Sequence, residues 1–268
     1  MIRLTLISLI VFVVLAPVVT AEPVRVAVCQ TLCIDSDKDG NLLRIENAIE
    51  KAAERGAQLA AFPECAVLGW VNPEAHQLAD PIPGPTTDRL GKLAREHNMM
   101  ISIGLCEKDG DKLYDSAVLI DSDGSILGVH RKVNTLDHLM DPPYTPGESV
   151  GVFETRLGRI GMLVCADTFK DDLVSQIRTQ DADLLLVPYG WAAAKDAWPE
   201  HGQSLRAWVE ATARRAGCDV VGTDLVGSIS SGPWAGMVYG GQSVVVSGGD
   251  VTVLTDRDVE VRIVEVGD

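Results

Sequence analysis

Residues 160–169 read IGMLVCADTF, and the expected architecture can be built outward from this segment. The apolar run from Ile160 to Val164 predicts a buried strand, and residues 171–179 have the composition of a helix. Cys165 therefore stands at the end of a strand and shortly before a helix, where a side chain can project from the edge of a sheet. Backbone N–H groups of the following turn favour negative charge there. The position suits a nucleophilic thiolate.

Strand and helix patterns alternate on both sides of this segment. The spacing of apolar residues predicts a helix over 40–55. Helices are also expected over 86–97, 171–179 and 205–216. Strands are expected over 24–30, 58–62, 99–105, 113–120, 126–133, 152–155, 159–164, 182–188, 218–223, 242–247, 251–254 and 259–264. Helical units mixed with hairpins indicate a layered α/β or α+β domain with mixed sheets. No linker-like segment interrupts residues 22–268, so one domain is predicted there.

The first 21 residues, MIRLTLISLIVFVVLAPVVTA, have the layout of a secretory signal. Arg3 precedes an apolar run from Leu4 to Ala16, and small residues close the segment at Ala21. The run is short for a bilayer span of about 20 residues. We expect cleavage after Ala21 and export to the periplasm or the cell exterior. An uncleaved anchor is the alternative, and it is the only route by which a membrane becomes a partner.

Charge and cysteine content exclude several functional classes. The chain has 23 Lys and Arg against 38 Asp and Glu, a net charge of −15, so its surface repels phosphate backbones and nucleic acid is not an expected partner. A hydrophobic content of 46% is that of a globular protein. The six cysteines include no C-x-x-C pair, so zinc is not expected. No other metal and no cofactor are predicted. Each cysteine except Cys165 is most simply a small buried apolar residue. Disulfide pairing of some cysteines in an exported chain is the alternative, and the sequence does not give the connectivity.

A nucleophilic thiol needs a base, and the sequence offers two kinds. One is a histidine in a Cys–His pair, for which the candidates are His130, His138 and His201. The other is a group presented, like Cys165, from the end of a strand. Glu64 follows the strand at 58–62, and Lys132 lies at the end of the strand at 126–133. The convergence of three strand ends, rather than any single residue, makes this second set informative.

With these residues in view, the sequence resembles the nitrilase superfamily, the carbon–nitrogen hydrolases. The motifs occur in the family's order over almost the whole chain after residue 24. They are Phe62-Pro63-Glu64, His130-Arg131-Lys132-Val133, Tyr144-Thr145-Pro146-Gly147, Val164-Cys165-Ala166-Asp167, the segment 182–188 and the segment 206–211. The resemblance implies a four-layer α-β-β-α sandwich that self-associates as a homodimer or higher homo-oligomer.

The resemblance also implies a Glu–Lys–Cys triad for cleaving a small amide. Carried over residue by residue, Glu64 is the general base, Cys165 attacks the carbonyl carbon, and Lys132 with the backbone N–H of Ala166 holds the oxyanion. The Lys132 ammonium is expected to favour the Cys165 thiolate, and burial is expected to raise the pKa of Glu64. The substrate would be a small molecule, with Tyr189 and Trp191 as further candidates to bind it.

Two departures from the family pattern bear on the substrate. Many members carry a second Glu before the Pro-Gly of the third motif, whereas here Asp141 is the nearest substitute, one methylene shorter, and it is the candidate to bind the substrate there. Members that act on acids bearing a carbamoyl or ω-amide group often place an Arg shortly after the cysteine motif. This chain has Thr168-Phe169 there, followed by Lys170, which argues against an amino-acid-like substrate.

Alternative functions stay open at this level. The sequence at 147–151 matches the serine-hydrolase motif G-x-S-x-G around Ser149, but a proline-rich segment precedes it and a strand pattern follows it, so its context is wrong. A non-catalytic binding or assembly subunit, an acyl-transferring member and a nitrilase are the remaining alternatives. Ala166-Asp167 after the cysteine favours an amidase over a nitrilase.

Overall fold

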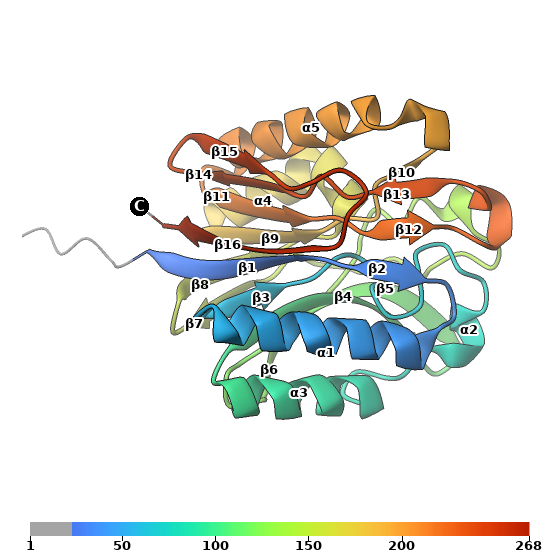
Figure 1. The fold of residues 1–268 in the computed structure, drawn as a ribbon, viewed down its shortest axis with the longest axis horizontal. Helices are drawn as coiled ribbons and strands as arrows, with labels where there is room; N and C mark the ends of the chain where they lie inside the picture. The colour runs from blue at the N-terminus through green and yellow to red at the C-terminus, as the bar shows by residue number, and fades with distance from the viewer. Residues whose placement is uncertain (1–22, 268) are drawn as a thin grey trace, which may run out of the picture.

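The computed structural model describes residues 23–267, which form two six-stranded mixed sheets (Figure 1). The strand order of the first sheet is β16-β1-β3-β4-β5-β6, and that of the second is β15-β14-β11-β9-β8-β7. The first contains β1 (Val24–Gln30), β3 (Leu59–Ala61), β4 (Met100–Asp109), β5 (Lys112–Ile120), β6 (Ile126–Arg131) and β16 (Glu260–Val266). The second contains β7 (Val152–Thr155), β8 (Gly158–Met162), β9 (Leu184–Pro188), β11 (Asp219–Thr223), β14 (Val244–Ser247) and β15 (Asp250–Val253).

Helices cover the outer face of each sheet. α1 (Lys38–Glu54) and α3 (Pro85–His97) pack on the first sheet, and α4 (Asp171–Thr179) and α5 (Glu200–Ala216) pack on the second, as Figure 1 shows. One apolar cluster lies between the first sheet and its helices, and another includes the inner faces of both sheets. The predicted four-layer α-β-β-α sandwich is therefore confirmed.

Local sequence explains where these helices begin and end. The Asp37 side chain accepts a hydrogen bond from the N–H of Gly40 and caps α1, and Pro85 opens α3. At the other end of α5, Gly217 adopts the left-handed conformation with φ of 73°, which glycine reaches without steric cost. Helix α5 begins at Glu200 rather than at 205, because its first turn carries polar residues that the apolar pattern does not detect.

A third sheet of four short strands was not predicted from the sequence. Its order is β10-β13-β12-β2, with bounds β10 (Ala192–Ala193), β13 (Val238–Gly240), β12 (Val226–Ser228) and β2 (Leu32–Ile34). Strands of two or three residues carry no readable alternation, and this sheet forms because the fold brings distant segments together. The short helix α2 (Ala75–Leu78) was missed for the same reason.

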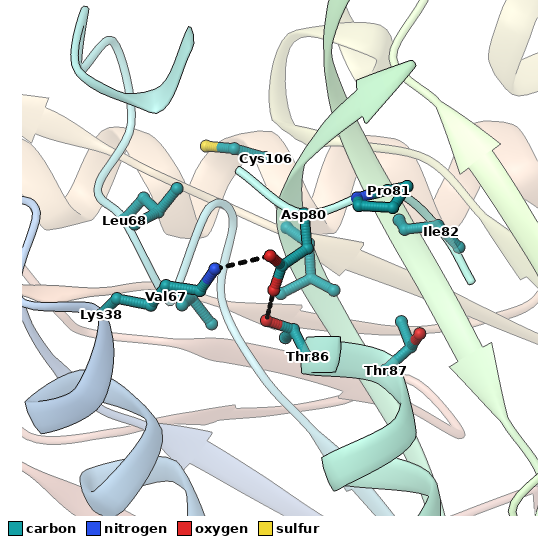
Figure 2. A pocket seen from close by; sticks show the side chains of 10 residues that line it. Lys38, Val67, Leu68, Asp80, Pro81, Ile82, Thr86, Thr87 and Cys106 are labelled. Carbon is teal, nitrogen blue, oxygen red and sulfur yellow. Dashed lines mark hydrogen bonds and ion pairs between the residues drawn. The ribbon is translucent and has the colours of Figure 1, made fainter. Parts of the chain in front are cut away.

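An internal ion pair fastens α1 to the segment before α3. Lys38 Nζ lies 2.8 Å from Asp80 Oδ1, and Thr86 Oγ1 donates to Asp80 Oδ2 at 2.6 Å. These groups form the polar side of a small pocket that Cys106 and Leu68 also line (Figure 2). The pocket does not include Glu64, Lys132 or Cys165.

The predicted signal segment 1–21 lies outside the described residues. Among residues 23–267, no helix combines the length and the apolar character that crossing a bilayer requires.

Candidate active site

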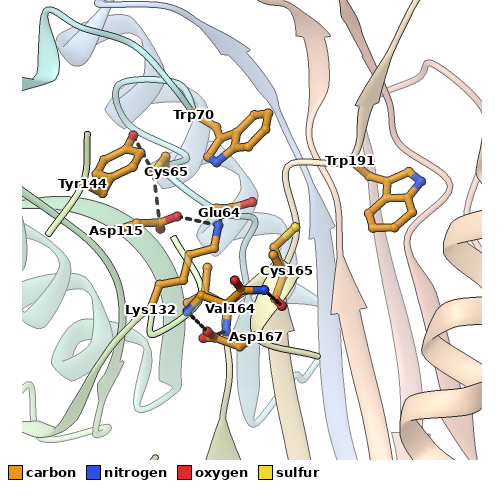
Figure 3. Close-up of polar contacts among 12 residues, drawn as sticks. Glu64, Cys65, Trp70, Asp115, Lys132, Tyr144, Val164, Cys165, Asp167 and Trp191 are labelled. Atoms are coloured by element: carbon orange, nitrogen blue, oxygen red, sulfur yellow. Dashed lines mark hydrogen bonds and ion pairs between the residues drawn. The ribbon is translucent and has the colours of Figure 1, made fainter. Parts of the chain in front are cut away.

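Three strands of the two sheets end beside one another and present the three predicted groups. Glu64 follows β3, Lys132 directly follows β6, and Cys165 opens the short 3-10 helix η2 (Cys165–Phe169) after β8. Figure 3 shows the three side chains around one point. Glu64 and Lys132 are fully buried, and Cys165 is 5% exposed. The convergence of three strand ends that the sequence predicted is therefore present in the structure.

Lys132 lies between two carboxylates. Its ammonium donates to Glu64 Oε1 through a short contact and to Asp115 Oδ2 at 2.9 Å. Asp115 lies in the middle of β5 and is fully buried. Two buried carboxylates therefore share one buried ammonium. The resulting excess of negative charge governs the proton affinities of the site.

The Glu64 segment sits closely on β4 because Gly104 lacks a side chain. The Gly104 N–H donates to Pro63 O at 3.0 Å. A Cβ on Gly104 would lie 2.5 Å from Glu64 Cα and 2.6 Å from Pro63 O, both of which are backbone atoms. Glycine at this position is thus a condition for the placement of Glu64.

Cys165 occupies a strained turn between β8 and α4. Its φ of 41° is in the left-handed region that side chains rarely adopt. Thr168 Oγ1 donates to Cys165 O at 2.7 Å, and Trp208 Nε1 donates to Thr168 Oγ1 at 2.7 Å. This chain of contacts holds the turn in place. Strain of this kind persists only where the surroundings enforce it, and it is common at reactive sites.

Asp167 joins the Lys132 segment to the Cys165 turn. Its Oδ1 accepts from the N–H groups of Val133 at 2.9 Å and Asn134 at 2.7 Å. Its Oδ2 accepts from Val164 N–H at 3.0 Å and lies 2.8 Å from His130 Nε2. One buried carboxylate therefore fixes the separation between the strand end that carries Lys132 and the one that carries Cys165.

Burial and the two acids set the protonation of the site. Burial and then the negative charge of Asp115 raise the pKa of Glu64, against the lowering effect of Lys132. Burial alone would lower the pKa of Lys132, but the negative charges of Asp115 and Glu64 outweigh burial and raise this pKa, so Lys132 remains an ammonium.

The pKa of Cys165 is raised, because burial and Glu64 outweigh Lys132 and the N–H of Gly190. The resting sulfur is thus a neutral thiol, whereas the sequence had suggested a thiolate. The structure shows all six cysteines unpaired, Cys165 included.

One oxygen of Glu64 is free to take a proton. Oε1 contacts Lys132, while Oε2 is buried and has no hydrogen-bond partner among the described residues. Oε2 faces Gly190, whose backbone N–H acts to lower the pKa of the Cys165 thiol. Buried carboxylate oxygens without a partner are uncommon, and a catalytic role is one of the explanations for them.

The predicted substrate-binding residues occupy different surroundings. Ala166 is buried in η2 directly after Cys165, and Tyr189 is fully buried after β9, with its hydroxyl 3.5 Å from Thr168 Oγ1. Trp191 is half-buried, and its ring lies 6.0 Å from that of Tyr189 and 5.9 Å from that of Phe169. Figure 3 places Trp70 and Trp191 on two sides of the Cys165 and Glu64 side chains.

Asp141 is not brought to the triad. It is exposed in the loop after the short 3-10 helix η1 (Asp137–Leu139), and it lines a separate surface pocket with His138 and Met140. The second acid that contacts Lys132, besides Glu64, is Asp115 from β5. A lone acid within the apolar segment 113–120 was the available signal for it.

The histidine candidates have other partners. His130 is buried against Asp167, so it supports the turn that carries Cys165 and does not act as the base for the thiol. His201 stacks on Trp191 with ring centroids 5.6 Å apart, and His138 is exposed. The Cys–His alternative is thus not supported, because the group beside the sulfur is Glu64.

Comparisons with known proteins agree with this geometry. The profile described as "Carbon-nitrogen hydrolase" matches residues 25–266. The chain is 32% identical over 162 residues to the omega-amidase NIT2 of Xenopus tropicalis, covering 56% of this chain and 58% of that protein. It is 28% identical to the bifunctional nitrilase/nitrile hydratase NIT4A of Nicotiana tabacum, covering 65% of this chain and 55% of that protein. The chain thus spans little more than half the length of these two curated relatives.

Solved structures match over a larger share of the fold. A carbon–nitrogen hydrolase from Helicobacter pylori superposes with a TM-score of 0.81 at 20% identity, covering 92% of this chain and 89% of that chain. An amidase from Nesterenkonia sp. gives 0.75 at 25% identity, with 92% and 91% covered. An α-β-β-α sandwich that joins a buried acid, ammonium and thiol is the architecture of the nitrilase superfamily. The chain belongs to the carbon–nitrogen hydrolase family, as its motifs predicted.

Proposed function

We propose that this protein hydrolyses the C–N bond of a small amide through a thioester on Cys165. The observation that carries the proposal is the unpartnered Oε2 of the buried Glu64, which faces Gly190 beside Cys165 while Oε1 is held by Lys132. A carboxylate with one oxygen anchored and the other free is arranged to exchange protons with the sulfur and with the leaving group.

The reaction follows from these positions. Glu64 takes the proton of the Cys165 thiol as the sulfur attacks the carbonyl carbon. The oxyanion that forms lies between the Lys132 ammonium and the backbone N–H of Ala166. Collapse of this intermediate expels ammonia or an amine, which leaves with the proton held by Glu64, and a thioester remains on Cys165.

Water then completes the cycle at the same groups. Glu64 accepts a proton from a water molecule as that water attacks the thioester carbon. The acid product departs and the thiol of Cys165 is restored with the proton from Glu64. One amide and one water are consumed for each acid and amine released. A neutral resting thiol suits this sequence, because the proton that leaves the sulfur is the one delivered to the amine.

We propose further that the acyl group of the substrate is uncharged. Arg215 reaches the turn that Cys165 opens, but its guanidinium bonds Asp171 Oδ1 at 2.6 Å and Thr168 O at 2.8 Å. The guanidinium of Arg215 therefore has no free pair of N–H donors with which to bind a substrate carboxylate. The aromatic rings of Phe169 and Trp191, packed edge to face, offer an apolar surface instead.

Amide hydrolysis is tested by a panel assayed for ammonia release. The panel contains simple aliphatic and aromatic amides, the matching nitriles, carbamoyl amines and an ω-amide acid. We expect turnover of the uncharged amides by the wild-type protein and none by Cys165→Ala. Full activity in Cys165→Ala, or turnover of nitriles alone, overturns the proposal. Added hydroxylamine reports acyl transfer, and a panel without any Cys165-dependent turnover supports the non-catalytic alternative.

Export and self-association are proposals of the same standing. The layout of residues 1–21 supports cleavage after Ala21, and family membership supports a homodimer or a higher homo-oligomer. N-terminal sequencing of the secreted protein tests the first proposal, and light scattering on the purified protein tests the second. An intact N-terminus or a monomer contradicts the corresponding proposal.

A further inference from the structure

Asp115 contacts Lys132 at both the side chain and the backbone. Its Oδ2 accepts from Lys132 Nζ at 2.9 Å, and its backbone carbonyl accepts from Lys132 N–H at 2.8 Å. Its Oδ1 lies 3.5 Å from the sulfur of Cys65, the residue that follows Glu64. Asp115 is thus joined to the segments that carry two members of the proposed triad, although the reaction described above does not use it.

We propose that Asp115 is a positioning residue whose negative charge makes Glu64 a strong enough base for the Cys165 thiol. The inference rests on the proposed function, because it explains why a site in which Glu64 acts as a base contains a second acid beside the single lysine. Asp115 acts through Glu64 and Lys132 and does not touch the substrate.

The charge balance carries the argument. Glu64 and Asp115 both contact the Lys132 ammonium, so their bonding oxygens lie within about 6 Å of each other, a range where like charges interact strongly. One ammonium cannot neutralise two buried carboxylates, and an unbalanced buried charge is costly. The cluster therefore favours taking up one more proton. Asp115 already accepts from Lys132 and Cys65, whereas Glu64 Oε2 has no partner, so Oε2 is where that proton is accommodated.

Other titratable groups around the cluster do not cancel this effect. Burial raises the pKa of Cys65 and of Tyr144, so both are neutral at the pH of the assay. Cys106, on β4, is a further neighbour and lies 3.7 Å from the Tyr144 hydroxyl. Beyond Lys132, Asp167 is ionised but is occupied by His130 and backbone donors. Cys165 is the remaining group, and it is the one from which the proton comes.

Asp115→Asn keeps the shape of the side chain and removes its charge. We expect the acid limb of kcat/KM to move to lower pH by about one unit, because Glu64 loses its like-charged neighbour. The alkylation of Cys165 by iodoacetamide, followed by peptide mass spectrometry, should move to lower pH as well, since Asp115 also disfavours the thiolate. This second readout needs no substrate.

Two variants separate charge from structure. Asp115→Glu retains the charge, so its acid limb should stay within about 0.3 unit of the wild type even if turnover falls. Glu107→Gln removes another buried carboxylate, one that accepts from Ser116 and Arg131, and should leave both profiles in place. If Asp115→Asn does not fold, Asp115→Ser, which leaves room for water, replaces it with the same expectation.

The outcomes distinguish the two proposals. A lower rate for Asp115→Asn with both pH profiles unmoved overturns the role of Asp115, as does a shift equal to that of Glu107→Gln. Failure of the proposed function would give a different result, namely no Cys165-dependent turnover by the wild-type protein. In that case the alkylation profile still tests whether Asp115 controls the proton affinity of the cluster.

Discussion

Replacing Asp167 by asparagine tests whether one buried carboxylate holds the two halves of the site together. The wild-type side chain accepts from three backbone N–H groups and from His130. Asparagine has a single acceptor oxygen, which can keep the bonds from Val133 and Asn134. Its NH₂ group then faces Val164 N–H and His130 Nε2. His130 can change tautomer and accept, but Val164 N–H has no remaining acceptor.

The cost follows from this count. One buried donor loses its partner, and the remaining bonds lose the assistance of a charge, which together amount to about 2–4 kcal/mol. For a chain of this size, the melting temperature should fall by roughly 5–15 °C. The separation of Lys132 and Cys165 should loosen as well, and a displacement of about 1 Å is enough to lower turnover about a hundredfold.

Urea unfolding at several pH values measures the effect. Burial alone would raise the pKa of Asp167, but the bonds from His130 and the backbone lower it, so ionisation of Asp167 stabilises the fold above the unfolded pKa. This contribution is lost as the pH falls, so the difference between wild type and Asp167→Asn should shrink below about pH 4. Asp123→Asn is the control: that acid is exposed in a turn and accepts from Ser125, and its replacement should change the free energy of unfolding far less than the replacement of Asp167. A cost below about 1 kcal/mol for Asp167→Asn would refute the bracing role.

Three further predictions concern the same region. Lys132→Ala should lower kcat by about 10²–10³, because the proposed oxyanion site loses its charged donor; stopped or endpoint ammonia assays measure this, and a loss below tenfold is incompatible with the role proposed for Lys132. Glu64→Gln should abolish turnover yet raise the free energy of unfolding by about 1 kcal/mol at pH 8. The raised pKa of Glu64 means that folding favours its protonated form, so the stabilisation over wild type should grow as the pH rises, and chemical denaturation at pH 5 and pH 8 checks this sign. Gly104→Ala should cost about 1–3 kcal/mol and at least tenfold in activity, because the new Cβ meets the Glu64 backbone; unchanged melting and turnover would show that the β4 contact can relax.

The local pattern of apolar and polar residues was enough to predict the main helices and strands of this protein. The helix predicted over 171–179 coincides with α4, and the apolar segment 182–188 contains the buried strand β9. Continuous apolar runs indicate buried strands, and apolar residues at helical spacing indicate the buried face of a helix. Both patterns involve residues that are close in sequence, so they can be read without the fold. The positions of Glu64, Lys132 and Cys165 at strand ends could be inferred for the same reason, with the family motifs supplying the order.

Contacts between distant strands were not readable in this way. Asp115 was visible in the sequence only as a lone acid in an apolar strand, and its contact with Lys132 follows from the pairing of β5 with β6. The partners of Asp167 likewise come from the segment after β6, which lies far from Asp167 in the sequence. The protonation of Cys165 depended on the balance between burial, Glu64 and Lys132, which is a sum over positions rather than a property of the motif. Sequence therefore indicated which groups reach the edge of the sheets. Packing of the two sheets determined which of them touch, because electrostatic and hydrogen-bond energies depend on distances that only the folded chain sets.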